Sequence, residues 1–231
     1  MKLSRQISPQ DHACAFYRDT YHQLSIAIPY LREALRRNER CLYLMDDITE
    51  HEIIHAMEDL SFDLQPVLRR RQLTFHPIWE THFRNGGFNP ADPIAFYTEQ
   101  LQDMQAGGYR GLSVVGVVAS SARPSVQKAL AQYERNASQQ LAGAPISAIC
   151  MYHEGLFSRS FLDEIRAAHP LVVAHQCPYF VDYVRECDTD RNQETIDDVR
   201  RTLITFCSNA NFDQCSVYRR MSMRSDSAQS A

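Results

Sequence analysis

The 231-residue chain is 44% hydrophobic and 23% charged, which is typical of a soluble globular protein large enough to bury a full core. Its formal net charge of −4 offers no electrostatic basis for direct nucleic-acid binding. No stretch approaches the ~18 consecutive apolar residues of a membrane span, and the amino terminus lacks the apolar core of a signal peptide. We therefore predict a cytoplasmic protein with no membrane partner.

The seven cysteines are scattered, and no two of them form a CxxC pair. Several lie inside apolar, strand-like runs, where a thiol behaves as a small hydrophobic group. This pattern favours reduced, buried thiols over a disulfide framework, which agrees with a cytoplasmic location.

Residues 12–17, His-Ala-Cys-Ala-Phe-Tyr, are predicted to form a buried first strand. Alternation along a strand places His12, Cys14 and Phe16 on one face of the sheet. In an α/β domain, ligands usually bind where such a strand ends and a helix begins. The glycine-rich loop of a phosphate site is missing there, because Tyr-Arg-Asp-Thr-Tyr follows instead.

Helical and strand patterns then alternate along the chain. Apolar spacing predicts a helix over 21–37. Pro29 either kinks this helix or marks the point where its regular part begins. An apolar strand over 41–45 follows, and Asp46 comes directly after it. Thr49 and Glu52 form a predicted capping box for a helix running to about residue 60. A short helical segment over 64–71 and a strand over 73–76 complete this half.

The longest stretch with no regular pattern spans residues 77–93. It holds the only tryptophan, Trp79, together with Phe83 and Phe88. Irregular loops of this length inside a compact domain are commonly functional. We predict that it is a lid or binding loop.

The second half continues the alternation, with helices predicted over 94–106, 125–141 and 158–168 and strands over 112–118, 146–152 and 171–173. Such βαβ repetition indicates an α/β fold, a three-layer sandwich around a mostly parallel central sheet. Residues 185–231 differ in character, with one amphipathic helix over 191–207 and a polar tail predicted to be disordered. We therefore divide the chain into residues 1–184 and 185–231.

The cysteines and histidines suggest two kinds of chemistry, metal binding and nucleophilic catalysis. Thiolate and imidazole suit zinc or copper, but His12, Cys14, Cys41, Cys150 and His153 do not have the spacing of a ligand loop. A Cys-His nucleophilic pair would need an activated elbow or oxyanion loop, and neither is visible. We therefore predict no enzyme activity and no cofactor, and keep a Cys/His metal or redox sensor as an alternative.

Binding of a small molecule is the favoured interpretation. Aromatic and sulfur-bearing walls suit a small apolar ligand, and a few polar groups orient it. The alternative is that these side chains simply fill the core. The predicted ligand-binding residues, at the carboxyl ends of the strands, are His12, Cys14, Tyr17, Asp46, Trp79, Phe88, Tyr152 and His153.

An ordered set of short segments resembles the MEDS domain, the methanogen/methylotroph DcmR-type sensory domain, over roughly residues 12–184. The segments are His12-x-Cys14-x-x-Tyr17, 38–43, 86–90, 108–112, Tyr133-Glu134, 149–152 and His169-Pro170. The resemblance implies a degenerate KaiC/RecA-like ATPase fold that has lost nucleotide hydrolysis and senses simple hydrocarbon derivatives. The chain indeed contains no Gly-Lys pair of a P-loop, and Val117 stands where many members carry an acidic residue.

The predicted function is a non-enzymatic ligand-sensing domain of prokaryotic signal transduction. It would bind a small organic effector and signal through a partner such as a histidine kinase or transcription regulator, with homo-oligomerisation left open. The first alternative is a ligand-free scaffold, an inactive ATPase relative that regulates a kinase or regulator by protein contact. The second is the Cys/His metal or redox sensor.

Overall fold

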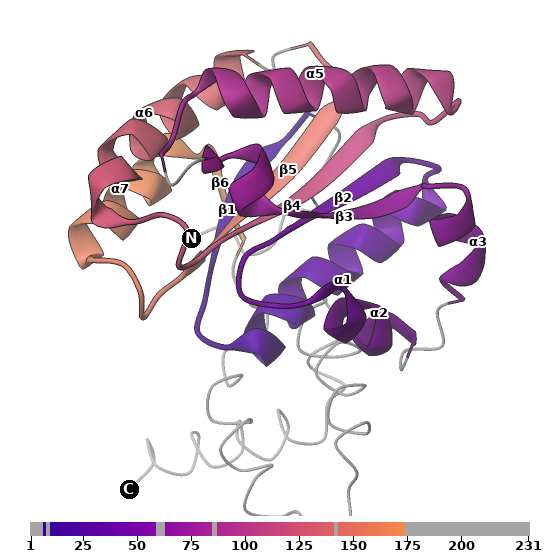
Figure 1. Cartoon of the computed structure of the whole chain (residues 1–231), viewed down its shortest axis with the longest axis horizontal. Helices are drawn as coiled ribbons and strands as arrows, with labels where there is room; N and C mark the ends of the chain where they lie inside the picture. Colours follow the sequence, from indigo (N-terminus) through magenta and orange to yellow (C-terminus); the bar gives the residue numbers. More distant parts are fainter. Residues whose placement is uncertain (1–6, 8–9, 59–62, 85–86, 141–142, 174–231) are drawn as a thin grey trace, which may run out of the picture.

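A six-stranded, all-parallel sheet forms the centre of the protein in a computed structural model (Figure 1). The structure describes residues 7, 10–58, 63–84, 87–140 and 143–173. The strand order is β3-β2-β4-β5-β1-β6, so β1 lies between β5 and β6 near one edge. The predicted α/β fold with helices on both sides of a parallel sheet is confirmed.

All six predicted strands are present, within one residue at each end. They are β1 (His12–Tyr17), β2 (Arg40–Met45), β3 (Leu73–Pro77), β4 (Leu112–Val118), β5 (Ile146–His153) and β6 (Leu171–Val173). Strands β1 and β4 are buried along their whole length. Continuous apolar runs are typical of strands covered on both faces, which is why the pattern identified them.

The helices are α1 (Thr20–Arg36), α2 (Glu50–Glu58), α3 (Gln65–Arg69), α4 (Ile78–Thr81), α5 (Ala91–Ala106), α6 (Pro124–Gln140) and α7 (Arg159–Ala168). The predicted capping box is present, since the Thr49 backbone N–H donates to the Glu52 carboxylate at 2.9 Å and the Glu52 N–H to Thr49 Oγ1 at 3.3 Å. Helix α1 continues through Pro29, and its N-cap is Asp19, whose side chain accepts the backbone N–H of His22.

The prediction of an irregular stretch over residues 77–93 was wrong in part. Strand β3 extends to Pro77, α4 occupies Ile78–Thr81, and α5 begins at Ala91, three residues earlier than predicted. A four-residue helix is only about one turn long, so it shows no apolar period in the sequence. The remaining irregular part is correspondingly short.

The two faces of the sheet have separate cores. Helices α1, α2 and α3 cover one face and bury Leu24, Ile53 and Val67 there, whereas α5, α6 and α7 cover the other (Figure 1). The side chains of His12, Cys14 and Phe16 point toward the α6 and α7 side, as alternation predicts, with Cys14 and Phe16 in that core. Ala15 and Tyr17 belong to the opposite core.

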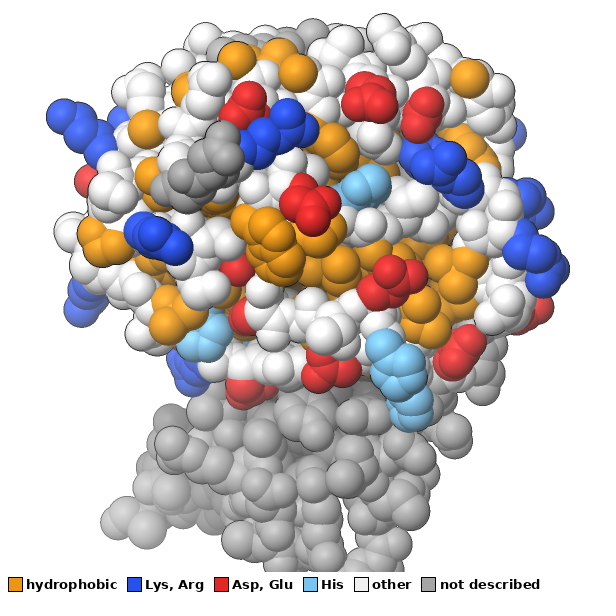
Figure 2. Space-filling model, in the orientation of Figure 1, with side chains coloured by type: hydrophobic (Ala, Val, Ile, Leu, Met, Phe, Trp, Pro, Cys, Tyr) orange, Lys and Arg blue, Asp and Glu red, His pale blue; other side chains and the backbone are white. Residues whose placement is uncertain are grey.

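On the face shown in Figure 2, acidic and basic side chains are interspersed around a central strip of hydrophobic groups. Within the described residues, no helix is long and apolar enough to cross a membrane. Three cysteines there, Cys14, Cys41 and Cys150, are free thiols. The predicted helix over 191–207, the polar tail and the boundary at residue 184 lie outside the described residues.

Candidate functional site

Neighbouring strands β1 and β5 bring His12 and Cys150 together. Cys14 pairs in register with Cys150, and His12 pairs with Ala148, so His12 and Cys150 are diagonal neighbours on the same face. His12 Nε2 lies 3.3 Å from Cys150 Sγ. Two residues 138 positions apart in the chain thus become direct partners because their strands are adjacent.

Helix α6 adds a buried carboxylate to this pair. Glu134 is 3% exposed, and its Oε2 atom lies 3.3 Å from His12 Nε2 and 3.9 Å from Cys150 Sγ. Its other oxygen, Oε1, accepts a 2.6 Å hydrogen bond from the Tyr152 hydroxyl. A charge-assisted bond of this kind holds the carboxylate in place.

His169, the residue that follows α7, completes the group. Its Nδ1 lies 2.8 Å from the carbonyl oxygen of Ile165, which can only accept, so Nδ1 carries the proton. The other nitrogen, Nε2, lies 3.4 Å from Glu134 Oε2 and makes no hydrogen bond. The backbone of α7 therefore aims this second nitrogen at the carboxylate.

We call His12, Glu134, Cys150 and His169 the polar cluster. One ligand atom from each residue lies within 4.8 Å of every other. Three of the four residues are buried, and Cys150 is partly buried. Two imidazoles, a thiol and a carboxylate in one small volume can share protons or hold a metal ion.

The pKa values of the polar cluster are strongly shifted. Burial acts to lower the pKa of His12, but Cys150 and Glu134 outweigh it and raise the value to about 9. Burial acts to raise the pKa of Glu134, but His12 and His169 outweigh it and lower the value well below the usual range. In the absence of an ion, the carboxylate is therefore ionised beside protonated imidazole.

A group of rings covers the same face further toward α4 and α5. We call it the aromatic cluster, and its members are His82, Phe83, Phe88, Phe96, Tyr97 and Tyr133. Ring centroids of Phe88 and Tyr133 are 5.5 Å apart, with an edge-to-face tilt of 68°. Tyr133 precedes Glu134 in α6, so one helix supplies both clusters.

Buried His82 gives the aromatic cluster a polar centre. The Thr81 hydroxyl donates to the carbonyl of Ile78, so it accepts from His82 Nδ1 at 2.8 Å. His82 Nε2 therefore accepts from the Tyr97 hydroxyl at 3.2 Å. Burial lowers the pKa of His82 to about 4, and the imidazole is neutral at pH 7.

The eight residues predicted to bind a ligand fall into separate groups. His12, Cys14 and Tyr152 lie at or beside the polar cluster, and Phe88 lies in the aromatic cluster. Tyr17 and His153 meet at the opposite end of β1, with ring centroids 5.1 Å apart. The six residues of β1 span roughly 16 Å from Cα to Cα, so these two groups are distinct.

Asp46 and Trp79 have other surroundings. The Asp46 carboxylate accepts the backbone N–H groups of Ala119 at 2.7 Å and Ser121 at 3.0 Å, and so fixes the turn after β4. Trp79 is 48% exposed on α4. Asp47, not Asp46, accepts from the Tyr17 hydroxyl, at 2.5 Å.

Three members of the polar cluster were not among the predicted ligand-binding residues. Cys150 was considered as a metal ligand, and Glu134 was noted only within a segment of resemblance. His169 was noted there, at a helix end and as a possible base for a cysteine nucleophile. All four members lie in the short segments that resemble the MEDS domain. That coincidence was the available signal, because helix rotation and strand order cannot be read from local spacing.

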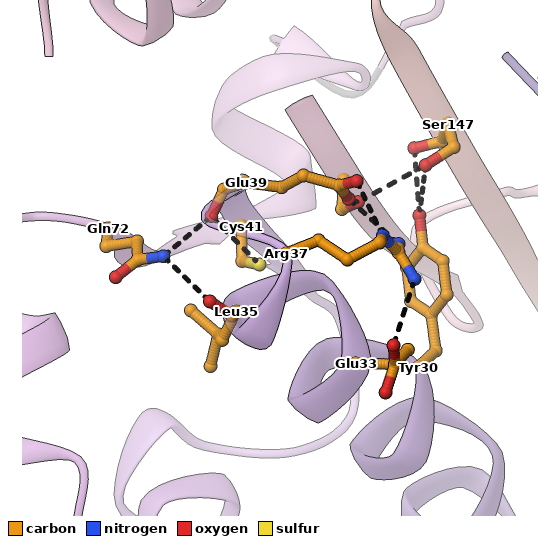
Figure 3. A network of polar contacts seen from close by, with 9 residues as sticks. Tyr30, Glu33, Leu35, Arg37, Glu39, Cys41, Gln72 and Ser147 are labelled. Carbon is orange, nitrogen blue, oxygen red and sulfur yellow. Dashed lines mark hydrogen bonds and ion pairs between the residues drawn. The ribbon is translucent and has the colours of Figure 1, made fainter. Parts of the chain in front are cut away.

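A pocket of about 230 Å³ opens at the amino ends of the strands. It is lined in part by Arg37, Glu39 and Ser147. Figure 3 shows that these walls are tied together, since Arg37 Nε donates to Glu39 at 2.7 Å and Tyr30 bonds to Ser147. The pocket lies at the edge opposite the one where the sequence predicted a site.

A known family model matches most of the chain. The family model described as MEDS, MEthanogen/methylotroph, DcmR Sensory domain, matches residues 11–170, more than two thirds of the 231 residues. No curated protein matches the chain significantly. The matched range spans β1 to the end of α7 and includes every member of both clusters. The chain therefore belongs to the MEDS family of sensory domains.

Proposed function

We propose that this protein is a non-enzymatic sensory domain of signal transduction that binds a small organic effector in the aromatic cluster and signals through a partner protein. The family name supports the sensory role. A histidine kinase or a transcription regulator is the class of partner that we propose.

The observation that carries the proposal is the neutral His82 imidazole surrounded by rings. His82 is buried, and its ring centroid lies 5.5 Å from that of Tyr97 and 6.5 Å from those of Phe83 and Tyr133. Apolar walls with one or two placed polar groups are what a small organic molecule requires. An alcohol or an amine could replace the Tyr97 hydroxyl as the hydrogen-bond donor to His82 Nε2.

Binding there would be coupled to movement of the covering segment. Phe88 is partly buried against the core, next to Phe83 and Tyr133, so a guest among the rings must displace it. A ligand shifts an equilibrium only through its different affinity for two states. The displaced arrangement of Phe88 and α5 would be the state that the effector favours.

The test is a thermal-shift titration of the full chain with methanol, acetone, acetate and methylamine. We expect at least one compound to raise the melting temperature in a saturable way. A ligand at 100 times its Kd stabilises the folded protein by about 2.7 kcal/mol. The saturable shift should be lost in Phe88→Trp, which fills the ring cluster, and kept in His51→Ala, an exposed residue of α2.

A chain that responds to none of these compounds would contradict the proposal. The ligand-free scaffold would then be the better account, because it predicts a core that side chains simply fill. A response that survives unchanged in Phe88→Trp would place the effector elsewhere and would also overturn the proposed site.

A further inference from the structure

We propose that the polar cluster is a binding site for a divalent transition-metal ion of the zinc class, held by His12, Glu134, Cys150 and His169. This inference goes beyond the effector site, since it concerns different side chains and stands without an organic ligand. The sequence alone favours no metal, with a Cys/His metal or redox sensor as an alternative. The structure points to a different ligand set, which adds Glu134 and His169 to His12 and Cys150.

The distances between the four donor atoms fit one ion. Ligands at zinc bond lengths of about 2.0 to 2.3 Å in a tetrahedron are separated from one another by about 3.3 to 3.6 Å. Glu134 Oε2 lies 3.3 Å from His12 Nε2, 3.4 Å from His169 Nε2 and 3.9 Å from Cys150 Sγ. His12 Nε2 and Cys150 Sγ are 3.3 Å apart. These four separations are already close to the edges of such a tetrahedron.

The donor atoms are also oriented for coordination. His169 donates through Nδ1 to the Ile165 carbonyl, so Nε2 is the nitrogen that can bind a metal, and any proton on Nε2 leaves when the ion binds. This nitrogen is fully buried and makes no hydrogen bond in the structure. Tyr152 holds Glu134 Oε1, so Oε2 is the oxygen that faces His12, Cys150 and His169. A backbone carbonyl that holds a histidine ligand and a donor that holds a carboxylate ligand are usual outer partners in a zinc site.

Charge and ligand type select the ion. A thiolate and a carboxylate together carry the two negative charges that a divalent cation neutralises. Sulfur and imidazole nitrogen favour zinc, cobalt or copper, whereas magnesium and calcium prefer oxygen ligands. Cys150 is the one partly exposed member, which gives the ion a route into the cluster.

A bound ion would tie together segments that are distant in sequence. The four ligands come from β1, α6, β5 and the residue that follows α7. Protein side chains would fill all four coordination positions of the ion. The site would therefore resemble a structural zinc site, which stabilises a fold. The α6 and α7 layer would thus be clamped to the sheet.

The experiment is metal loading of the purified full-length chain. The protein is stripped with a chelator, incubated with ZnCl₂ or CoCl₂, desalted and analysed by mass spectrometry of the metal content and by visible absorption. We expect one ion per chain and, with cobalt, the intense bands of a tetrahedral centre together with a thiolate charge-transfer band. Cys150→Ser should lose the charge-transfer band, and His169→Gln should lose stoichiometric binding.

Cys41→Ser is the matched control, because Cys41 is a buried thiol in the core of the opposite face. It should keep both the stoichiometry and the charge-transfer band. A folded wild-type chain, checked by circular dichroism, that retains no zinc or cobalt would overturn the proposal without any variant. So would a charge-transfer band that persists in Cys150→Ser. Thermal shifts with the organic compounds are measured on chelator-treated protein. A failure of effector binding can therefore be told apart from a failure of metal binding.

Discussion

Two buried glutamates lie in different parts of the fold and are neutralised in opposite ways. Glu39 is 5% exposed, accepts two bonds from the Arg37 guanidinium at 2.7 and 2.9 Å, and accepts a third from the Ser113 hydroxyl at 2.5 Å (Figure 3). Glu134 is 3% exposed and faces two imidazoles and a thiol. A guanidinium is always charged, whereas imidazoles and thiols gain or lose a proton.

The difference separates a structural network from an exchangeable one. Around Glu39, the positive charge is permanent and belongs to the protein, so no outside group is needed. Around Glu134, the positive charge consists of protons that a metal ion can replace, because metal ligands bind in their deprotonated forms. Burial of a carboxylate therefore does not indicate a site, whereas burial beside replaceable protons does.

The largest effect should come from removing the permanently paired glutamate. Glu39→Ala leaves Arg37 without its main partner, and breaking a buried ion pair costs about 3 kcal/mol or more of unfolding free energy. Arg37 is 28% exposed and can turn toward water, which keeps the expected loss near that value. Urea unfolding measures it. Glu33→Ala is the control, because Glu33 is 40% exposed at 3.8 Å from the same guanidinium. Equal losses in the two variants would contradict the structural role of Glu39.

A second contrast concerns pH, because His82 is buried without a carboxylate at hydrogen-bond distance and stays neutral. Its pKa is about 4 in the folded protein, where burial lowers it, against 6.5 in the unfolded chain. Above pH 6.5 the imidazole is neutral in both states, and its contribution to stability is complete. As the pH falls below 6.5, only the unfolded chain takes up the proton, so stability is lost until the pH reaches about 4.

At pH 5 the loss attributable to His82 should be about 2 kcal/mol. The unfolding free energy of wild type and His82→Gln, measured between pH 7 and pH 5, should therefore converge as the pH falls. His51→Gln, at an exposed position, should follow the wild-type curve. Parallel curves for wild type and His82→Gln would show that His82 is not kept neutral by burial.

The sequence determined more of the fold than of the site. Strands such as β4 were located by unbroken apolar runs, and the Thr49 and Glu52 pair located a helix start, because these signals are local. The polar cluster depends on the adjacency of β1 and β5 and on which side of α6 faces the sheet. Glu134 lies in a helical segment, where a glutamate is usually a surface residue. The helix predicted over 158–168 correctly ends just before His169, but the second nitrogen of His169 has a role that only tertiary packing shows.

The smallest effect compares the hydroxyl groups that donate to the two glutamates. Tyr152→Phe keeps the packing of the ring against Phe157 and Phe161 and removes the 2.6 Å bond to Glu134 Oε1. Loss of a hydrogen bond to a buried carboxylate costs about 1.5 kcal/mol. Ser113→Ala removes a bond to Glu39 Oε2, but that oxygen keeps its 2.9 Å bond from Arg37, so about 0.5 kcal/mol is expected.

Both hydroxyl variants are compared by urea unfolding in the presence of a chelator, so that an ion cannot replace the missing donor at Glu134. If Ser113→Ala costs as much as Tyr152→Phe, the guanidinium does not compensate for a lost donor, and the distinction between the two glutamates fails. If zinc then restores Tyr152→Phe but leaves Ser113→Ala unchanged, the ion acts at Glu134 alone. That selectivity follows from the geometry, since only Glu134 presents an oxygen toward two imidazole nitrogens and a sulfur atom within 3.3 to 3.9 Å.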